Sequence, residues 1–181
     1  MGKLYLKTGN ILDDEYLEKA DAIVNPTNPM MRCGAGVSGL IFKKAGVDIL
    51  EQYTEKTWGI SYNNPIGKNE MKVTEVRVTP GFGIPCDIIF AQGPRIWDYD
   101  DYRTAEQVLI NTYAEIFMIS VKKSYKNILM PALGTGDYGF SHEKVAPIVM
   151  SYIGRLIHNL PFDIYYVLTD SDTKKIYENY L

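Results

Sequence analysis

The stretch ADAIVNPTNPMMRCGAGVSGLIFKKAG, residues 20–46, decides the fold of this chain. It begins with the apolar run Ala22 to Val24, which is typical of a buried strand. Two prolines then exclude a regular helix, and the turn Gly34 to Gly36 leads into a helical pattern of apolar residues. This order is a physical device for binding phosphate, because free backbone N–H groups and the helix dipole both face the anion.

Composition and charge limit the class of protein. The chain has 181 residues, of which 46% are hydrophobic and 23% are charged, as in an ordinary globular domain. The net charge of -3 argues against a nucleic-acid partner, because general phosphate-backbone binders usually carry a basic excess. The two cysteines imply no disulfide framework, and no apolar run reaches the length of a membrane span. We therefore expect one domain over residues 1–181, a cytoplasmic location and no membrane partner.

Strand and helix signals alternate along the chain. We expect strands over residues 3–8, 22–25, 71–79, 87–91, 127–132 and 163–169, and a polar loop over 59–69. Helices are expected over 13–19, 36–45, 47–58, 102–123, 141–159 and 172–180. This alternation predicts an α/β fold with three α/β/α layers, in which helices cover both faces of a mostly parallel, mixed sheet of about six strands.

The fold class points to three loops as ligand contacts. Open α/β sheets bind ligands beyond the carboxyl ends of their strands. That rule selects the loops that contain Asn10-Ile11, Asn25 to Gly36, and Gly134 to Phe140. Each glycine turn alone is a weak signal, because such turns are common structural punctuation. Two such turns, with Asn25 and Asn28 ahead of the first, together favour a ligand that contains phosphate. Neither turn is followed by the Gly-Lys-Ser/Thr of a nucleotide-triphosphate loop.

At these residues the chain resembles the macro domain family. The resemblance is carried in order by Gly9 to Ile11, Ala22 to Asn28, Gly34 to Val37 and Pro131 to Phe140. Macro domains bind ADP-ribose, and many remove it from proteins or deacetylate O-acetyl-ADP-ribose. The resemblance implies that this chain binds ADP-ribose or an ADP-ribosylated protein and hydrolyses such conjugates. A reader module that binds without turnover is the alternative. RNA binding is a third hypothesis, against which the net negative charge argues.

The resemblance also implies roles for single residues. Asn10 would accept a hydrogen bond from the adenine amino group, and the backbone N–H of Ile11 would meet the ring. Asn28 would hold the distal ribose while Asn25 braces the loop; without the resemblance, both read as turn formers beside prolines. Phe140 would pack near the distal ribose, and a position in the hydrophobic core is an equal alternative for it. Contact with the diphosphate and the distal ribose is implied for Gly34, Ala35, Gly36, Val37, Gly134, Thr135, Gly136, Asp137 and Tyr138.

One departure from the family bears on catalysis. Its best-known hydrolases carry an aspartate directly after the first glycine turn, where this chain has Ser38. A serine without a histidine or lysine nearby in the sequence is a poor base, which favours the reader. Tyr138 to Phe140 resembles the hydrolytic branch, which favours the enzyme. The candidate catalytic residues are Asn28, Ser38 and Asp137, the last being the nearest carboxylate able to substitute for the missing aspartate.

Neither a cofactor nor a metal ion is expected. His142 and His158 have no metal-ligand companion at a useful spacing, and both are predicted to be ordinary helix positions.

Overall fold

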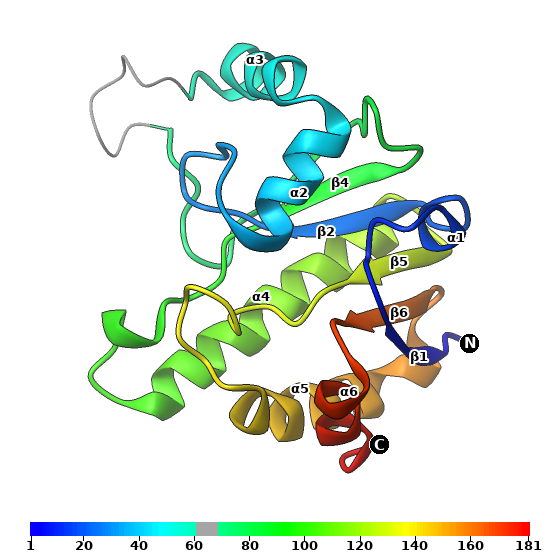
Figure 1. The fold of residues 1–181 in the computed structure, drawn as a ribbon. Helices are drawn as coiled ribbons and strands as arrows, with labels where there is room; N and C mark the ends of the chain where they lie inside the picture. Colours follow the sequence, from blue (N-terminus) through cyan, green and yellow to red (C-terminus); the bar gives the residue numbers. More distant parts are fainter. Residues whose placement is uncertain (61–68) are drawn as a thin grey trace.

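The computed structural model describes residues 1–60 and 69–181 and contains a six-stranded sheet between helices (Figure 1). Most of the predicted polar loop over 59–69 lies outside the described residues. The strands are β1 (Leu4–Thr8), β2 (Ala22–Pro26), β3 (Val76–Thr79), β4 (Asp87–Ala91), β5 (Asn127–Met130) and β6 (Asp163–Leu168). The helices are α1 (Asp14–Leu17), α2 (Gly36–Ala45), α3 (Val47–Trp58), α4 (Tyr102–Lys122), α5 (His142–Leu156) and α6 (Ser171–Glu178), with 3-10 turns at Ile96–Asp98 and Ile157–Asn159.

The strands are arranged in the order β1-β6-β5-β2-β4-β3. All neighbours run parallel except β3, which pairs antiparallel with β4 at the edge of the sheet. The predicted fold class, a three-layer α/β/α domain with a mostly parallel, mixed sheet, is therefore confirmed. Of the described helices, none combines the length and apolar character that crossing a membrane requires.

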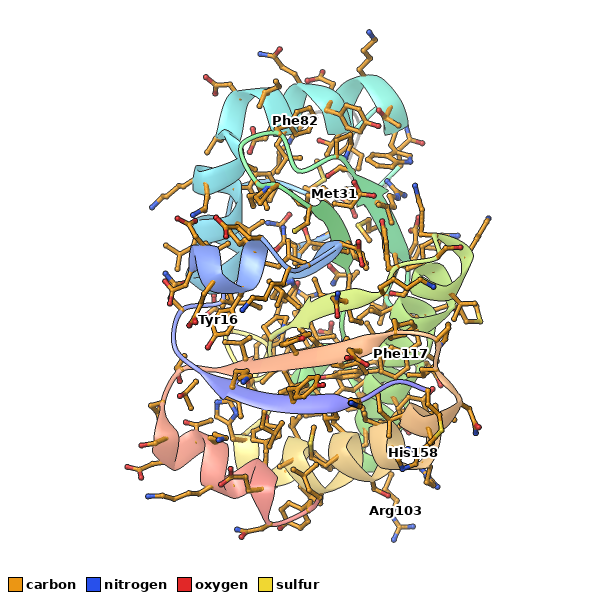
Figure 2. The ribbon with its side chains drawn as sticks, turned by 90° about the vertical axis from the view of Figure 1, so that its right-hand side faces the viewer. Tyr16, Met31, Phe82, Arg103, Phe117 and His158 are labelled. Atoms are coloured by element: carbon orange, nitrogen blue, oxygen red, sulfur yellow. The ribbon has the colours of Figure 1, made fainter. Side chains whose placement is uncertain are left out.

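Alternating side chains of the central strands supply two separate cores. In β2, Ala22 and Val24 face the core under α4 and α5, whereas Ile23 faces the core under α1, α2 and α3. All three side chains are fully buried, as expected for a strand with helices on both faces. Figure 2 shows these two sides of the sheet, with Phe117 of α4 on one and Met31 on the other.

Two predicted strand ends are corrected by the structure. The predicted strand over 71–79 begins only at Val76, because the chain turns at Thr74, whose φ is 71°. The predicted strand over 127–132 ends at Met130, directly before Pro131, which has no N–H to donate to a ladder. The shorter β5 frees Pro131 and Ala132 to line the space beyond the sheet.

A buried hydroxyl ties this space to the core. The side chain of Tyr113 in α4 is fully buried, and its hydroxyl lies 2.9 Å from the hydroxyl of Tyr166 in β6. The same oxygen accepts the backbone N–H of Leu133 at 3.3 Å, at the start of the second glycine loop. One hydroxyl thus joins a helix, a strand and a loop.

We predict that Tyr113→Phe lowers the free energy of unfolding by about 1–3 kcal/mol, because it leaves the Leu133 N–H buried without its partner. Denaturant unfolding measures this change. Tyr180→Phe, at a side chain that is 47% exposed, is the matched control and is expected to have almost no effect. Equal effects of the two substitutions would contradict the role of the buried hydroxyl.

Candidate functional site

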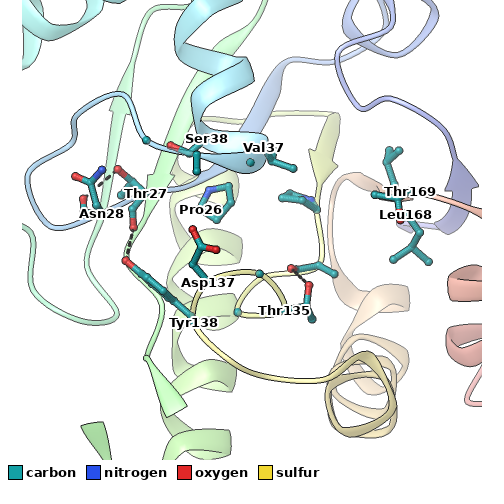
Figure 3. A pocket seen from close by; sticks show the side chains of 18 of the residues that line it. Pro26, Thr27, Asn28, Val37, Ser38, Thr135, Asp137, Tyr138, Leu168 and Thr169 are labelled. Atoms are coloured by element: carbon teal, nitrogen blue, oxygen red, sulfur yellow. Dashed lines mark hydrogen bonds between the residues drawn. The ribbon is translucent and has the colours of Figure 1, made fainter. Parts of the chain in front are cut away.

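A cavity of about 460 Å³ lies beyond the carboxyl ends of β2, β5 and β6 (Figure 3). Residues 26–28 and 34–38 form one wall, and residues 131–132 and 134–138 form the opposite wall. His142, Val167, Leu168 and Thr169 complete the lining. Figure 3 places Asn28 and Tyr138 toward one end and Leu168 and Thr169 toward the other. The volume lies within the range of ordinary small-molecule sites.

The first wall is fixed from behind by a buried arginine. Arg32 is 4% exposed, and its guanidinium donates to the backbone carbonyls of Glu51 and Ile60. The backbone N–H of Cys33 donates to a carboxylate oxygen of Glu51 at 2.9 Å. Asn28 closes the loop, since its amide nitrogen donates to the Arg32 carbonyl at 2.8 Å and its oxygen accepts the Arg32 N–H at 3.2 Å. The loop is therefore held against α3 without any ligand.

The backbone of Gly36 opens toward unoccupied space. Its φ is +58°, and no heavy atom lies within 4 Å of the position that a Cβ would take. Gly36 is the first residue of α2, so the positive end of the helix dipole lies at the cavity. Ala35 precedes it with a φ of −92°, a conformation that alanine adopts without strain. An anion can approach this backbone closely.

Ser38 is the third residue of α2 and also lines the cavity. The residue is 6% exposed, and its buried hydroxyl has no hydrogen-bond partner among the described residues. A buried hydroxyl without a partner is costly, so this group is a candidate to bind a ligand or a water molecule.

The second wall is tied across the cavity to the first. The hydroxyl of Tyr138 donates to the carbonyl of Thr27 at 3.1 Å, a bond drawn in Figure 3, and accepts from the amide of Gln92 at 3.3 Å. Within the loop, the Thr135 hydroxyl donates to the Ala132 carbonyl at 2.9 Å. Tyr138 thus sets the separation between the two walls.

Few ionisable side chains line the cavity. Among the described lining residues, Asp137, Tyr138 and His142 are ionisable, and none is a lysine or arginine. Burial lowers the pKa of the His142 imidazole, which favours the neutral ring, although Glu143 and Asp170 oppose this shift. In residues 1–60 and 69–181, no cluster of three or more His, Cys, Asp or Glu is arranged to hold a metal ion. Backbone N–H groups and neutral side chains are therefore the groups available to an anionic ligand.

The structure brings together most of the predicted site residues. Those that line the cavity are Asn28, Gly34, Ala35, Gly36, Val37, Ser38, Gly134, Thr135, Gly136, Asp137 and Tyr138. They come from two segments about one hundred residues apart in the sequence, as the carboxyl-end rule predicts.

Four predicted residues do not line the cavity. The side-chain oxygen of Asn10 accepts the Leu12 N–H at 3.1 Å, and Ile11 is buried in the core under α1 to α3. Asn25 is fully buried, and neither polar atom of its amide has a partner among the described residues, so no bracing contact is seen. Phe140 is 2% exposed and belongs to the core under α4 and α5, which is the core position that the sequence left open.

Residues at the end of β6 were missed by the sequence reasoning. Val167, Leu168 and Thr169 line the cavity, as does His142 in the first turn of α5. The carboxyl-end rule could have found the first three, because they end a parallel strand beside β5. His142 directly follows the second glycine loop, but no residue pattern distinguished it from an ordinary helix position.

Comparisons with known proteins agree on one family. The Macro domain family model matches residues 24–149. A protein of Escherichia fergusonii named O-acetyl-ADP-ribose deacetylase is 30% identical, over 89% of this chain and 87% of its own length. A Macro domain-containing protein of Methanosarcina mazei is 29% identical, over 87% of this chain and 78% of its own.

Solved structures agree with the sequence comparisons. A mutant macrodomain of Oceanobacillus iheyensis with ADPR has a TM-score of 0.81 at 28% identity, covering 97% of this chain and 90% of its own. The macrodomain of the same organism with ADP has a TM-score of 0.80 at 28% identity, covering 97% and 88%.

Two helical glycines test how the first wall is packed. A Cβ on Gly39 of α2 would lie 2.2 Å from the backbone carbonyl of Gly34, whereas a Cβ on Gly154 of α5 would meet nothing within 4 Å. We predict that Gly39→Ala lowers the free energy of unfolding by about 1–3 kcal/mol, because the Gly34 loop must move. Gly154→Ala is the matched control and is expected to stabilise by about 0.5–1 kcal/mol through helix propensity. Stabilisation by both substitutions in thermal unfolding would show that the loop is not packed against α2.

Proposed function

This chain belongs to the macro domain family, and we propose that it binds ADP-ribose in the cavity between its two glycine loops and hydrolyses ADP-ribose conjugates. The observation that carries the proposal is the open backbone of Gly36, at the N-terminus of α2 and across from the second loop. Relatives named O-acetyl-ADP-ribose deacetylase support the reaction class. The substrate is O-acetyl-ADP-ribose or a mono-ADP-ribosylated protein.

We infer a place for each part of the ligand from the residues that line the cavity. The diphosphate would lie between Gly36 and Gly136, where backbone N–H groups meet it without a lysine or arginine. The distal ribose would lie toward Asn28 and Tyr138, and the adenosine toward Leu168 and Thr169. Asn28 already bonds to the Arg32 backbone, so it would contact the ribose through its second N–H or second lone pair.

The same geometry limits the mechanism of hydrolysis. Among the described residues, no base is hydrogen-bonded to Ser38, so its hydroxyl would orient the attacking water or a ribose hydroxyl rather than act as a nucleophile. Asp137 is exposed and is the one carboxylate among the described lining residues, which makes it the side chain available to accept the proton of that water. The diphosphate of the substrate is the other candidate base.

A reader that binds ADP-ribose without turnover is the second candidate function. The specific observation in its favour is Ser38, which stands where the best-known hydrolases of the family carry an aspartate. In this case the cavity would present ADP-ribosylated proteins to other partners. A cytoplasmic location is proposed for either function.

The affinity of the whole ligand can be compared with the affinity of a shorter fragment of it. We expect ADP-ribose to bind at least tenfold more tightly than AMP in calorimetry, because both glycine loops and the Asn28 end of the cavity contact the whole molecule. Equal affinity for the two ligands would contradict the assignment of a distal ribose to Asn28 and Tyr138.

Two substitutions separate the positioning of the ribose by Asn28 from a direct chemical role of Ser38. Asn28→Ala should lower single-turnover release of ADP-ribose or acetate by about 100-fold, because a small misplacement of the ribose is costly in rate. Ser38→Ala should lower it by only about fivefold, the value of one hydrogen bond. If Ser38→Ala is as inactive as Asn28→Ala, the hydroxyl has a direct chemical role. Retained binding with no turnover by the wild type would instead support the reader.

A further inference from the structure

Three buried tyrosines lie behind the cavity, and one of them contacts a residue that lines it. The Tyr113 hydroxyl accepts the Leu133 N–H at 3.3 Å and lies 2.9 Å from the Tyr166 hydroxyl. The ring of Tyr166 packs against the ring of Tyr177 in α6, with centroids 5.4 Å apart. The Tyr177 hydroxyl lies 2.9 Å from Nδ1 of His142.

All three tyrosines are fully buried. Burial raises the pKa of each phenol, so each hydroxyl keeps its proton at neutral pH. Each hydroxyl can therefore donate one hydrogen bond and accept others. A buried hydroxyl proton without an acceptor is costly, so the proton of Tyr177 is expected to have an acceptor within the protein.

The hydroxyl proton of Tyr177 fixes the state of His142. Among the described residues, Nδ1 of His142 is the hydrogen-bond partner of this buried hydroxyl. The hydroxyl proton is paired only if Tyr177 donates to an unprotonated Nδ1. A proton on Nδ1 would point at the hydroxyl and leave the buried hydroxyl proton unpaired. The ring therefore carries its proton on Nε2.

The surroundings of His142 agree with a neutral ring. His142 is in the first turn of α5, where the helix dipole disfavours a positive charge. Burial lowers its pKa, while Glu143 of the same helix and Asp170 at the N-cap of α6 partly offset this. His142 lines the same cavity as Leu168 and Thr169, and its partner Tyr177 belongs to α6, the helix that follows these two residues. With Nδ1 bonded to Tyr177, Nε2 is the polar atom that the ring offers to the cavity.

We propose that the buried Tyr177 hydroxyl fixes His142 as the Nε2–H tautomer, so that this residue donates one hydrogen bond to the adenosine half of the bound ligand. The inference rests on the proposed function for the identity of the ligand. His142 thereby acts as a specificity-determining residue, because it presents a donor and no acceptor at this end of the cavity.

Calorimetry with ADP and ADP-ribose tests the contact. We expect His142→Leu to weaken both ligands by the same factor, about fivefold, because both contain the adenosine half. His142→Gln, whose amide can donate from nearly the position of Nε2, should recover most of the affinity. Tyr177→Phe should weaken binding in the wild-type background but not in the His142→Leu background, because its effect on the ligand passes through the ring. Asn28→Ala is the matched control and should weaken ADP-ribose alone.

The tautomer is read directly from long-range proton–nitrogen correlations of the imidazole in the ligand-free protein. We expect the Nε2–H pattern in the wild type and a mixture of tautomers in Tyr177→Phe. The Nδ1–H pattern in the wild type, unchanged affinity in His142→Leu, or a larger loss for ADP-ribose than for ADP in that variant would each overturn the inference. Binding of neither ligand by the wild type would overturn the proposed function as well, whereas binding of both with unaffected variants would overturn the inference alone.

Discussion

The pairing of β2 with β5 is the constraint on which the rest of the site depends. The two strands pair only at Ala22 with Ile128 and at Ile23 with Leu129, and their ladder ends there although β2 continues to Pro26. From β2 the sheet continues to β4 on one side, and from β5 it continues to β6 on the other. The connections that follow β2 and β5 therefore lead away from the centre of the sheet in opposite directions. Open α/β sheets form a crevice at such a point. This pairing brings two glycine loops together that are about a hundred residues apart in the sequence.

The walls of this crevice are held in place by side chains that would not touch the ligand. Arg32 fastens the first loop to the backbone of α3, and Tyr138 spans the crevice to the Thr27 carbonyl. The Tyr113 hydroxyl holds the start of the second loop. Because these bonds exist without a ligand, little of the binding energy would be spent on ordering the loops. The cavity nevertheless retains polar groups without a hydrogen-bond partner among the described residues, such as the Ser38 hydroxyl. A ligand or a water molecule that bonds to this hydroxyl would remove the cost of leaving it unpaired.

The sequence predicts those features that depend on local patterns. The buried apolar run of β2, the glycine at the start of α2 and the second glycine loop all follow from residue type and spacing, and the structure places them as expected. Phe140 could not be assigned in this way, because the choice between core and cavity depends on how α4 packs behind the loop. The predicted start of β3 was wrong for a similar reason. The turn at Thr74 has a positive φ, and no glycine or asparagine stands there to indicate it in the sequence.

His142 shows where reasoning from sequence ends. Its partner Tyr177 is 35 residues away in α6, and only the packing of α6 against α5 brings the two side chains together. The central claim is that the crevice beyond β2 and β5 binds ADP-ribose, and amide chemical shifts during an ADP-ribose titration test it most directly. The largest changes are expected in Gly34 to Ser38 and Gly134 to Tyr138. Changes confined to the separate hollow that Tyr5, Tyr16 and Tyr165 line, or no changes at saturating ligand, would contradict it.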